Sequence, residues 1–597
     1  VVMLAAAVVS VAGIAPGDAE RVGFVEAAWL SLMRTLDPGT MGGDTGWSFR
    51  LVMLGVTLGG IFVISTLIGV LTSGIGQRLD ELRKGRSQVV ETGHTVILGW
   101  SEQVFDIVSE LAIANADHPG SAVVILADRD KIAMLDEVRR KVGSTHPMRV
   151  VCRTGSPAVP ADVELVSIDT ARAIVVLAPE GDPDPDAAII KAVLAITNRP
   201  ARRPVPYHVV AELQEEKNRD VLRMVAGDEI EIVVVPDLIA RIIAQTSRQP
   251  GLSVAYTELL DFAGDEIYFR AEPTLVGRSF RETLHAYADA TVIGVRPAAG
   301  APRLNPPMEL SIGGADELIV IATDDTRIRL AAAARPPVAL DRIVPPGPVG
   351  PPSPERTLFL GWNRHAAAVL RELDAYVPVG SAARVVGEFE RPGVLTARFG
   401  SLAHQTVAFE AGEITDRATL DALEVPTFHH VIVLASDAMD SQQADARTIV
   451  TLLHLRDIAE RSGAGFSIVT EMLDVRNRTL VEGQRVEDFI VSKRLVGLIL
   501  SQIAEHKALA AVFADLFDPE GSEVYLKPMV AYVTPGPSVS FHTLIEAAAQ
   551  RDEIAIGYRH VRPAQGKGAH HGVVLNPPKS ESIVVTETDQ LIVVAEG

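Results

Sequence analysis

The chain has 597 residues, of which 47% are hydrophobic and 22% are charged, so its composition is that of a globular protein rather than a disordered chain. A formal net charge of -21 argues against a nucleic-acid-binding surface, which needs clustered Lys and Arg. A single cysteine excludes a disulfide within the chain, and this length indicates about four domains.

The first segment, residues 1–19, is apolar over about fifteen residues, which is too short to cross a bilayer. It begins without an initiator Met or a basic stretch, so we do not expect a signal peptide. We interpret it as the end of an outer transmembrane helix whose start precedes Val1.

A spanning helix is predicted over 51–76, where the sequence has no charged residue. At 1.5 Å per residue this run is longer than the ~30 Å hydrocarbon core. Arg78 and Arg83 follow it as a cytoplasmic flank, so everything downstream is expected to be cytoplasmic. A buried core helix is the alternative. Four glycines in the run are candidates for a hinge or for close packing: Gly55, Gly59, Gly60 and Gly69.

Residues 20–50 hold a short amphipathic segment, 22–36, and then the glycine-rich loop "TLDPGTMGGDTGW". The order of outer helix, short helix, polar loop and inner helix predicts a pore domain, because irregular backbone at membrane depth survives where it is buried or lines water. Backbone carbonyls and carboxylates there replace the hydration shell of a cation. An ordinary extracellular turn is the alternative. The candidate selectivity-filter residues are Asp37, Gly39, Thr40, Met41, Gly42, Gly43 and Asp44.

Downstream of a linker that ends at residue 93, the chain repeats itself at a distance of about 260 residues. "TVILGW" is echoed by "TLFLGW", and "LNPP" occurs near the end of each copy. Apolar strands alternate with helices, which predicts an α/β fold: a parallel, doubly wound sheet in each copy, followed by a smaller α+β lobe. The predicted segments are the inner helix and linker at 51–93, lobes at 94–250 and 251–335, a Pro-rich linker at 336–355, and lobes at 356–506 and 507–597.

The first strand-to-helix turn of each copy keeps one glycine of the GxGxxG pattern that seats a pyrophosphate on a helix N-terminus. Side chains replace the second and third glycines, so a bound dinucleotide is not favoured. An acid follows the second strand of each copy, where a ribose-binding residue would lie, although such an acid is more often solvated or caps a helix. The candidate positions are Gly99, Ser101 and Asp128 in the first copy and Gly361, Asn363 and Glu388 in the second.

The loop "PEGDPDPDAA" presents four carboxylates directly after a predicted strand, and hard cations such as Ca²⁺ prefer oxygen ligands from such a loop. The alternative is an acidic cap for the helix that follows, favoured by the helix dipole. The second copy has a weaker version. The candidate metal ligands are Glu180, Asp182, Asp184, Asp186, Asp437 and Asp440. The sequence shows no HExxH, Walker loop or nucleophile elbow, so we do not expect an enzyme.

A pore segment followed by paired Rossmann-like units resembles potassium channels gated by regulator-of-conductance (RCK) domains. "LMRTLDPGTMGGDTGW" and "HTVILGWSEQ" more closely resemble the Castor/Pollux ion-channel family, in a bacterial member. The resemblance implies a multi-pass homotetramer in the plasma-membrane bilayer, with one central pore and a cytoplasmic gating ring of RCK domains. It also implies cation conduction, of K⁺ or of Ca²⁺ among other cations, gated by a ligand on the ring, with Ca²⁺ the leading candidate. The filter differs from the plant members' alanine-aspartate-glycine-asparagine type, so the resemblance does not transfer their ion preference.

Two other classes of protein are alternatives to a channel. One is a membrane-tethered, nucleotide-sensing regulatory subunit of a cation transport system, and the other is a membrane-anchored NAD-dependent oxidoreductase. Both predict intact phosphate-binding turns, which neither copy has. In the channel hypothesis, a ligand shifts the population of ring states, and the linker over 77–93 transmits that movement to the pore.

Overall fold

The computed structural model describes residues 1–17, 20–83, 85–200, 202–331, 338–347, 350, 352–399, 401–463, 465–481, 488–560 and 572–596, with the backbone alone at 74–83 and 479. Parts of the two predicted linkers, residue 84 and residues 336, 337, 348, 349 and 351, lie outside these ranges. The chain forms two compact units, Val1–Ser87 and Gln88–Gly597, called here the N-terminal and C-terminal units. The division falls within the predicted linker 77–93.

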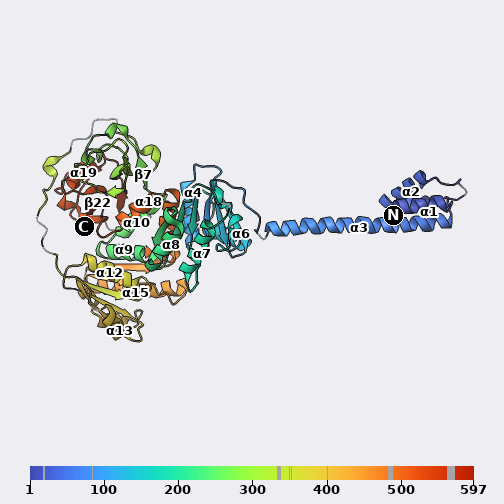
Figure 1. Ribbon diagram of the computed structural model, residues 1–597. Coiled ribbons are helices and arrows are strands. Elements are labelled where there is room, and N and C mark those ends of the chain that lie inside the picture. The colour runs from blue at the N-terminus through green and yellow to red at the C-terminus, as the bar shows by residue number, and fades with distance from the viewer. Residues whose placement is uncertain are drawn as a thin grey trace. The chain divides into compact units, whose positions relative to one another are not determined.

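The N-terminal unit consists of four helical elements (Figure 1): α1 (Val2–Val11), α2 (Phe24–Leu36), the 3₁₀ turn η1 (Pro38–Gly43) and α3 (Trp47–Arg83). The short amphipathic helix predicted over 22–36 is confirmed as α2. Within α3, Trp47–Ser73 is long and apolar enough to cross a membrane, whereas α1 is shorter. The predicted spanning helix therefore forms, and it extends beyond 51–76 at both ends.

Close packing in this unit depends on one glycine of α3. A Cβ atom on Gly60 would lie 2.8 Å from Cα of Thr35 in α2, so a larger residue would push the two helices apart. A Cβ on Gly59 would lie 3.2 Å from a methyl group of Val1, which directly precedes α1. Gly55 and Gly69 face open space within the chain, and α3 continues without a break through all four positions. Packing accounts for Gly60, and the hinge role of these glycines stays a prediction.

The C-terminal unit begins with a six-stranded parallel sheet in the order β3-β2-β1-β4-β5-β6. Every strand residue of β1, β2, β4 and β5 is buried, because helices cover both faces of a parallel sheet. The strands are β1 (Thr95–Leu98), β2 (Ala122–Ala127), β3 (Arg149–Thr154), β4 (Ala173–Val176), β5 (Val209–Leu213) and β6 (Ile230–Val234). The helices between them are α4 (Gln103–Ala114), α5 (Lys131–Lys141), α6 (Pro160–Glu164), α7 (Pro185–Thr197) and α8 (Arg219–Ala226).

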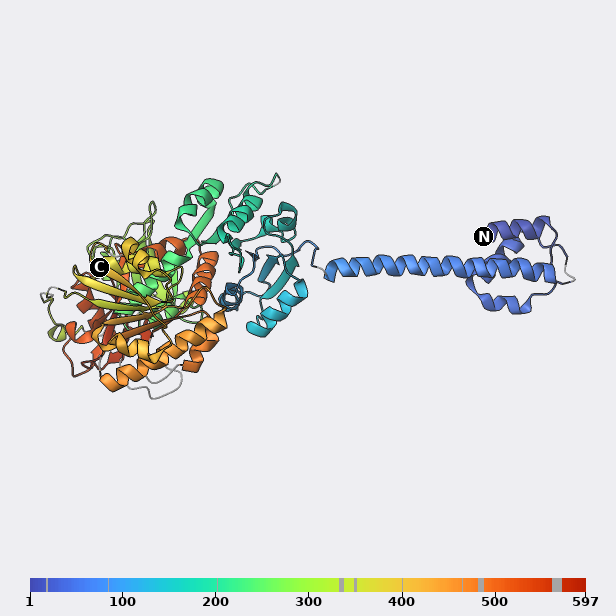
Figure 2. The same ribbon diagram turned by 90° about the horizontal axis from the view of Figure 1, so that it is seen from below.

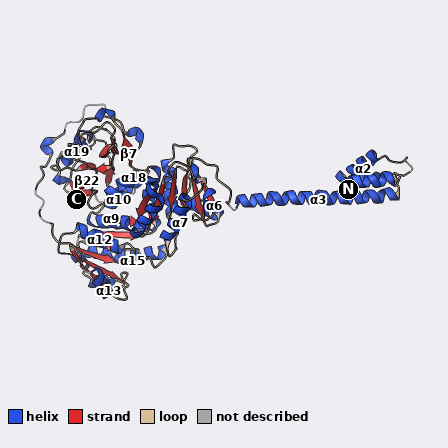
Figure 3. Ribbon diagram, viewed as in Figure 1, coloured by secondary structure: helices blue, strands red, loops and turns tan. Residues whose placement is uncertain are grey.

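The second copy repeats this topology in the order β13-β12-β11-β14-β15-β16, which confirms the predicted duplication. Figure 3 shows the strands in red among the blue helices. Its strands are β11 (Arg356–Leu360), β12 (Ser381–Gly387), β13 (Gln405–Ala411), β14 (His430–Val433), β15 (Ser467–Met472) and β16 (Asp488–Val491). Its helices are α12 (Ala366–Tyr376), α13 (Pro392–Phe399), α14 (Arg417–Ala422), α15 (Ser441–Ser462) and α16 (Val475–Val481). Figure 2 shows α15, in orange, beside the yellow strands.

The two copies exchange the helix that follows their last parallel strand. Helix α9 (Val235–Arg248) leaves the first sheet and packs on α12, β14 and β15 of the second copy. Helix α17 (Ser492–Glu505) leaves the second sheet and packs on α4, β4 and β5 of the first. A Cβ on Gly497 would lie 2.9 Å from Cβ of Asp106, so glycine lets α17 approach α4 closely. One face of each parallel sheet is therefore covered in part by a helix from the other copy.

Each copy ends in a small lobe built on a four-stranded antiparallel sheet, in the orders β7-β10-β8-β9 and β17-β22-β19-β20. The first lobe contains α10 (Leu252–Leu260), β7 (Glu266–Arg270), α11 (Phe280–Thr283), β8 (Thr291–Arg296), β9 (Arg303–Leu304) and β10 (Glu317–Ala322). The second contains α18 (Leu509–Leu516), β17 (Ser522–Pro528), β18 (Val539–Ser540), α19 (Phe541–Ala549), β19 (Ile554–Arg559), β20 (Val573–Leu575), β21 (Ser582–Ile583) and β22 (Gln590–Glu596).

The repeated "LNPP" motif joins the two small lobes symmetrically. The side-chain amide of Asn305 donates to the backbone carbonyl of Asp552 at 2.8 Å, and that of Asn576 donates to the carbonyl of Asp289 at 3.1 Å. Both asparagines have positive φ, 39° and 42°, a conformation that asparagine tolerates better than most residues. The repeat is therefore visible in the contacts between the copies as well as within each copy.

Candidate functional site

The predicted filter segment forms a 3₁₀ turn whose first end is capped by Asp37. The Asp37 carboxylate accepts a hydrogen bond from the Gly39 amide at 2.8 Å, and the Thr40 hydroxyl donates to the Asp37 carbonyl at 2.7 Å. Asp37, Gly39, Gly42 and Gly43 are exposed in the single chain, and Thr40 and Met41 are half-buried. This part of the segment is therefore mostly exposed, and its one carboxylate, Asp37, caps the turn.

Asp44 lies differently, because its carboxylate points into the unit. It is 3% exposed and pairs with Arg34 of α2, whose Nε donates to Oδ2 at 2.9 Å. A free carboxylate that lines a water-filled path would be open in a single chain, and Asp44 is not placed in this way. Sequence reasoning missed Arg34, since no local pattern indicates which basic residue an acid ten positions away will meet.

The C-terminal unit holds the linker from α3 along the segment between α6 and β4. The Val89 amide donates to the Leu165 carbonyl and the Gly93 amide to the Thr170 carbonyl, both at 2.8 Å. The Ser167 hydroxyl donates to the Val89 carbonyl at 2.5 Å. Residues 88–93 therefore belong structurally to the first Rossmann-like lobe, and any movement of that segment would displace the linker.

The retained glycines of the two Rossmann turns are required by a close approach of backbone. Gly99 has φ +104° and Gly361 has φ +96°. A Cβ at Gly99 would lie 2.6 Å from the Leu177 carbonyl oxygen, and one at Gly361 would lie 2.6 Å from the Leu434 carbonyl oxygen. The glycine therefore serves the fold of the turn itself, whether or not a ligand binds there.

The second copy has a cavity of about 220 Å³ at the carboxyl ends of β11, β12, β13 and β14, which is where an open α/β sheet binds ligands. Glu388, one of the predicted positions, lines it and accepts from Arg447 of α15 at 2.5 Å. Arg447 also donates to Glu413 at 2.7 Å. Burial alone would raise the pKa of Glu413, but hydrogen bonds from Thr415 and Arg447 outweigh it and lower the pKa to about 2. The cavity thus combines apolar walls with an anchored acid–arginine group.

The backbone amides at the start of α12, where a pyrophosphate would sit, already have acceptors. Asn363 Oδ1 accepts from the amides of His365 at 3.0 Å and Ala366 at 3.2 Å. The Asp437 carboxylate accepts from the Arg364 amide at 2.6 Å. A phosphate would have to displace these side chains, one of them negatively charged. In the first copy, Ser101 is buried and Asp128 is exposed.

A buried glutamate at the end of the fifth strand of each sheet braces the same turns. In the first copy, Glu212 accepts from the Ala178 amide at 2.7 Å. In the second, Glu471 accepts from the Asn363 side-chain amide at 2.7 Å and from the Ala435 amide at 3.2 Å. Burial raises the pKa of each carboxyl to about 7. The repeat contained the signal for this pair, because "VVAEL" and "IVTEM" place a glutamate at the same position in each copy.

The acidic loop after β4 serves as a cap for α7. Asp186 is buried and accepts three hydrogen bonds, from the Gln214 amide at 2.8 Å, the Glu215 amide at 3.0 Å and the Asn218 side chain at 2.7 Å. Asp184 accepts from the Ala187 amide at 3.2 Å in the first turn of α7. The Asp184 contact matches the capping alternative, whereas Asp186 joins α7 to the loop after β5.

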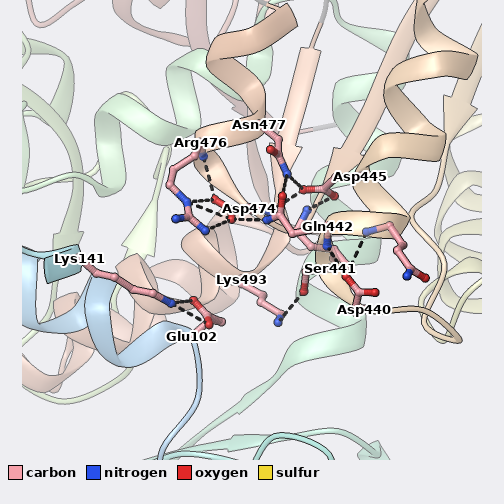
Figure 4. A network of polar contacts seen from close by, with 12 residues as sticks. Glu102, Lys141, Asp440, Ser441, Gln442, Asp445, Asp474, Arg476, Asn477 and Lys493 are labelled. Carbon is pink, nitrogen blue, oxygen red and sulfur yellow. Dashed lines mark hydrogen bonds and ion pairs between the residues drawn. The ribbon is translucent and has the colours of Figure 1, made fainter. Parts of the chain in front are cut away.

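In the second copy, Asp445 makes hydrogen bonds that correspond to those of Asp186 (Figure 4). Its carboxylate accepts from the Leu473 amide at 2.8 Å, the Asp474 amide at 3.0 Å and the Asn477 side chain at 2.8 Å. Asp440 caps the start of α15 through the Gln442 amide at 3.1 Å. Asp445 was missed from the sequence because it lies inside a long helix, away from the acidic loop.

The remaining candidate metal ligands also have partners within the chain. Glu180 pairs with Lys493 of α17 at 2.7 Å, and Asp182 accepts from the Asp184 amide at 2.9 Å. Lys493 lies 3.5 Å from the Ser441 hydroxyl (Figure 4). Across the part of the chain that the structure describes, no three His, Cys, Asp or Glu side chains are grouped to hold a metal ion. The structure does not bring the six predicted ligands together as a calcium site.

Comparison with solved structures identifies the fold of the C-terminal unit. The structure of the human SLO3 gating ring aligns with a TM-score of 0.57, covering 84% of this chain and 99% of that one at 15% identity, which shows the fold alone. Tandem RCK domains of the gating-ring type therefore make up the C-terminal unit, and the predicted fold class is confirmed.

Sequence comparison then identifies the family. Residues 236–338 match the family profile described as "Castor and Pollux, part of voltage-gated ion channel". Ion channel CASTOR of Lotus japonicus is 31% identical over 94% of this chain and 70% of its own length. Probable ion channel POLLUX of Arabidopsis thaliana is 32% identical over 96% of this chain and 73% of its own length. The chain belongs to the CASTOR/POLLUX family of ion channels, which makes it a membrane protein; the named relatives are ion channels and not enzymes.

The chain is shorter than its relatives. It spans 66% of the probable ion channel CASTOR and 62% of the probable ion channel POLLUX of Oryza sativa subsp. japonica, at 32% identity to each.

Proposed function

We propose that the protein is a homotetrameric cation channel whose pore is opened and closed by ligand binding to its tandem RCK domains. The observation that carries this proposal is the succession of α1, α2, η1 and α3 in one compact unit, ahead of RCK domains that hold the linker from α3. Glycine-rich backbone after a short helix is what an ion filter needs. The predicted filter positions other than Asp44, from Asp37 to Gly43, are proposed to line the ion path.

The proposed location is the plasma membrane, with more than one span in each chain. The apolar stretch of α3 supports one span, and the short apolar α1 supports the end of another. The basic residues that follow the apolar stretch, Arg78 and Arg83 at the end of α3, support a cytoplasmic position for the RCK domains.

Assembly of four chains is supported by apolar side chains that are exposed to solvent on the C-terminal unit. Met224 of α8 is 82% exposed, and Leu453 of α15 and Leu480 of α16 are 51% and 74% exposed. Met224 and Leu480 lie on corresponding helices of the two copies, α8 and α16. Apolar side chains of this size are unfavourable in water, and a neighbouring chain would cover them. A single chain also supplies only part of a pore.

The proposed permeant ion is K⁺, and Ca²⁺ is the first gating ligand to test, as the family resemblance implies. No group of residues is assigned to Ca²⁺, because the acidic loops cap helices. A regulatory nucleotide is the second candidate ligand. The cavity beside Glu388 favours it, and the occupied amides at the start of α12 oppose its phosphates.

Single-channel recording of the purified protein in planar bilayers tests the proposal, with K⁺ on one side, Na⁺ on the other and cytoplasmic Ca²⁺ stepped. We expect unitary currents, a reversal potential that ranks K⁺ and Na⁺, and an open probability that follows Ca²⁺. A calcium response that persists when Asp182 and Asp184 are both changed to Asn would place the calcium site outside the acidic loop.

A protein that is monomeric in mild detergent, or a confirmed tetramer that stays silent under every ligand, would contradict the channel proposal. Co-purification of a nucleotide with such a silent protein would favour the membrane-tethered sensor.

A further inference from the structure

Among the residues of the N-terminal unit whose side chains the structure describes, one charged pair is buried in the single chain. Arg34 lies in the last turn of α2 and Asp44 follows η1 directly, and these residues are 7% and 3% exposed. The guanidinium contacts the carboxylate through two nitrogens: Nε donates to Oδ2 at 2.9 Å, and Nη2 donates to Oδ1. This two-point contact fixes the orientation of the carboxylate as well as its position.

Both members of the pair are held by further contacts. Arg34 Nη1 donates to the Leu30 carbonyl at 2.9 Å, and the guanidinium carbon lies 5.3 Å from the centre of the buried Phe49 ring in α3. The backbone carbonyl of Asp44 accepts from Arg50 Nε at 2.7 Å. The pair therefore ties the end of α2 and the start of α3 to the same point.

The segment between the two partners is the short 3₁₀ turn η1, which leaves open space around its last two glycines. A Cβ on Gly42 or Gly43 would meet nothing within 4 Å, so neither glycine is held by a side-chain contact in the chain. At the other end, Asp37 caps the Gly39 amide. The backbone of Pro38–Gly43 is thus positioned by its two ends, one closed by Asp37 and the other by Arg34 and Asp44.

From this geometry, and resting on the proposed channel function, we propose that the Arg34–Asp44 pair is a positioning device that fixes the filter backbone and thereby sets ion selectivity. Asp44 acts through Arg34 and is not a ligand for the permeant ion. Neutralising one partner leaves the other charge buried without compensation, which is costlier than removing both. The effects of the two single changes are therefore expected to be non-additive.

The test is a double-mutant cycle with Arg34→Gln, Asp44→Asn and the double variant, together with the exchange Arg34→Asp/Asp44→Arg. The readouts are the K⁺/Na⁺ reversal potential of single channels and the melting temperature of the detergent-solubilised protein. We expect each single change to shift the permeability ratio several-fold and to lower the melting temperature. The double variant should be no worse than either single change. Glu26→Gln, an exposed carboxylate on the same helix, is the matched control.

Additive effects in both readouts would overturn the inference. So would a conductance change in Asp44→Asn that Arg34→Gln does not share, because an ion-facing carboxylate predicts that result. A wild-type protein that conducts nothing contradicts the proposed channel function instead. The melting-temperature cycle then still decides whether the two residues act as a pair, so the two failures are distinguishable.

Discussion

Buried carboxylates hold backbone turns in place at equivalent positions of the two copies. Glu212 and Glu471 each lie at the end of a central strand and accept hydrogen bonds from the turn after the fourth strand. Both are about 1% exposed. A carboxylate in such a place keeps its proton at a higher pH than in water, because burial penalises the charged form. These residues therefore make the stability of the C-terminal unit depend on pH.

We expect Glu471→Gln to change the pH dependence of stability. The pKa of Glu471 is raised from 4.5 to about 7, so between these values the folded state keeps a proton that the unfolded chain has released. The stabilisation is complete below pH 4.5 and is lost as pH rises toward 7, by about 3 kcal/mol. The glutamine variant should therefore gain stability relative to wild type across this window. Melting temperatures from pH 4.5 to 7.5 measure the gain.

The exposed Glu520 provides the control substitution Glu520→Gln for that experiment. A difference between Glu471→Gln and wild type that stays constant from pH 4.5 to 7.5 would contradict the assignment, since it would show that Glu471 holds no proton in the folded state.

At the scale of elements, the acidic residues connect helices to loops. Asp186 and Asp445 each join a helix to the loop after the neighbouring strand through two backbone amides and an asparagine side chain. A carboxylate is suited to this because it accepts several hydrogen bonds at once, and it is also favoured near a helix N-terminus. The same acidity that suggested a metal site thus stabilises the packing of α7 and α15.

Asp186→Ala should destabilise the protein by about 3 kcal/mol, because it removes three hydrogen bonds to a buried carboxylate. Asp182→Ala, at an exposed position in the same loop, should change stability by less than about 0.5 kcal/mol. Unfolding in denaturant with and without added Ca²⁺ measures both effects. If calcium stabilises wild type and Asp186→Ala but not Asp182→Ala, the loop binds the metal after all.

The whole C-terminal unit is held together by the exchange of α9 and α17 between the copies. Each helix covers a face of the other copy's parallel sheet, so neither sheet is complete within its own half of the unit. A Rossmann-like lobe with one bare apolar face is poorly soluble. The physical unit of folding is therefore the pair of RCK domains.

Fragments 88–347 and 352–597 should consequently be insoluble when expressed separately and should be recovered as a complex when expressed together. Gly497→Val should reduce recovery of that complex, since any Cβ at this position would lie 2.9 Å from Cβ of Asp106. Co-purification through a tag on one fragment, followed by gel filtration, measures both effects. A first fragment that unfolds cooperatively by itself would contradict this view of the unit.

The sequence by itself determined the parts of this protein: the long apolar helix, the short helix before the predicted filter loop, the two parallel sheets and their repetition. These depend on local composition and on periodicity, which a single chain displays directly. Tertiary structure alone decided which groups meet. Arg34 pairs with Asp44 inside the N-terminal unit. The loops after β5 and β15 donate hydrogen bonds to Asp186 and Asp445. Helices α9 and α17 each pack on the other copy. Such pairings join distant segments, and their energy depends on burial and geometry that no local pattern records.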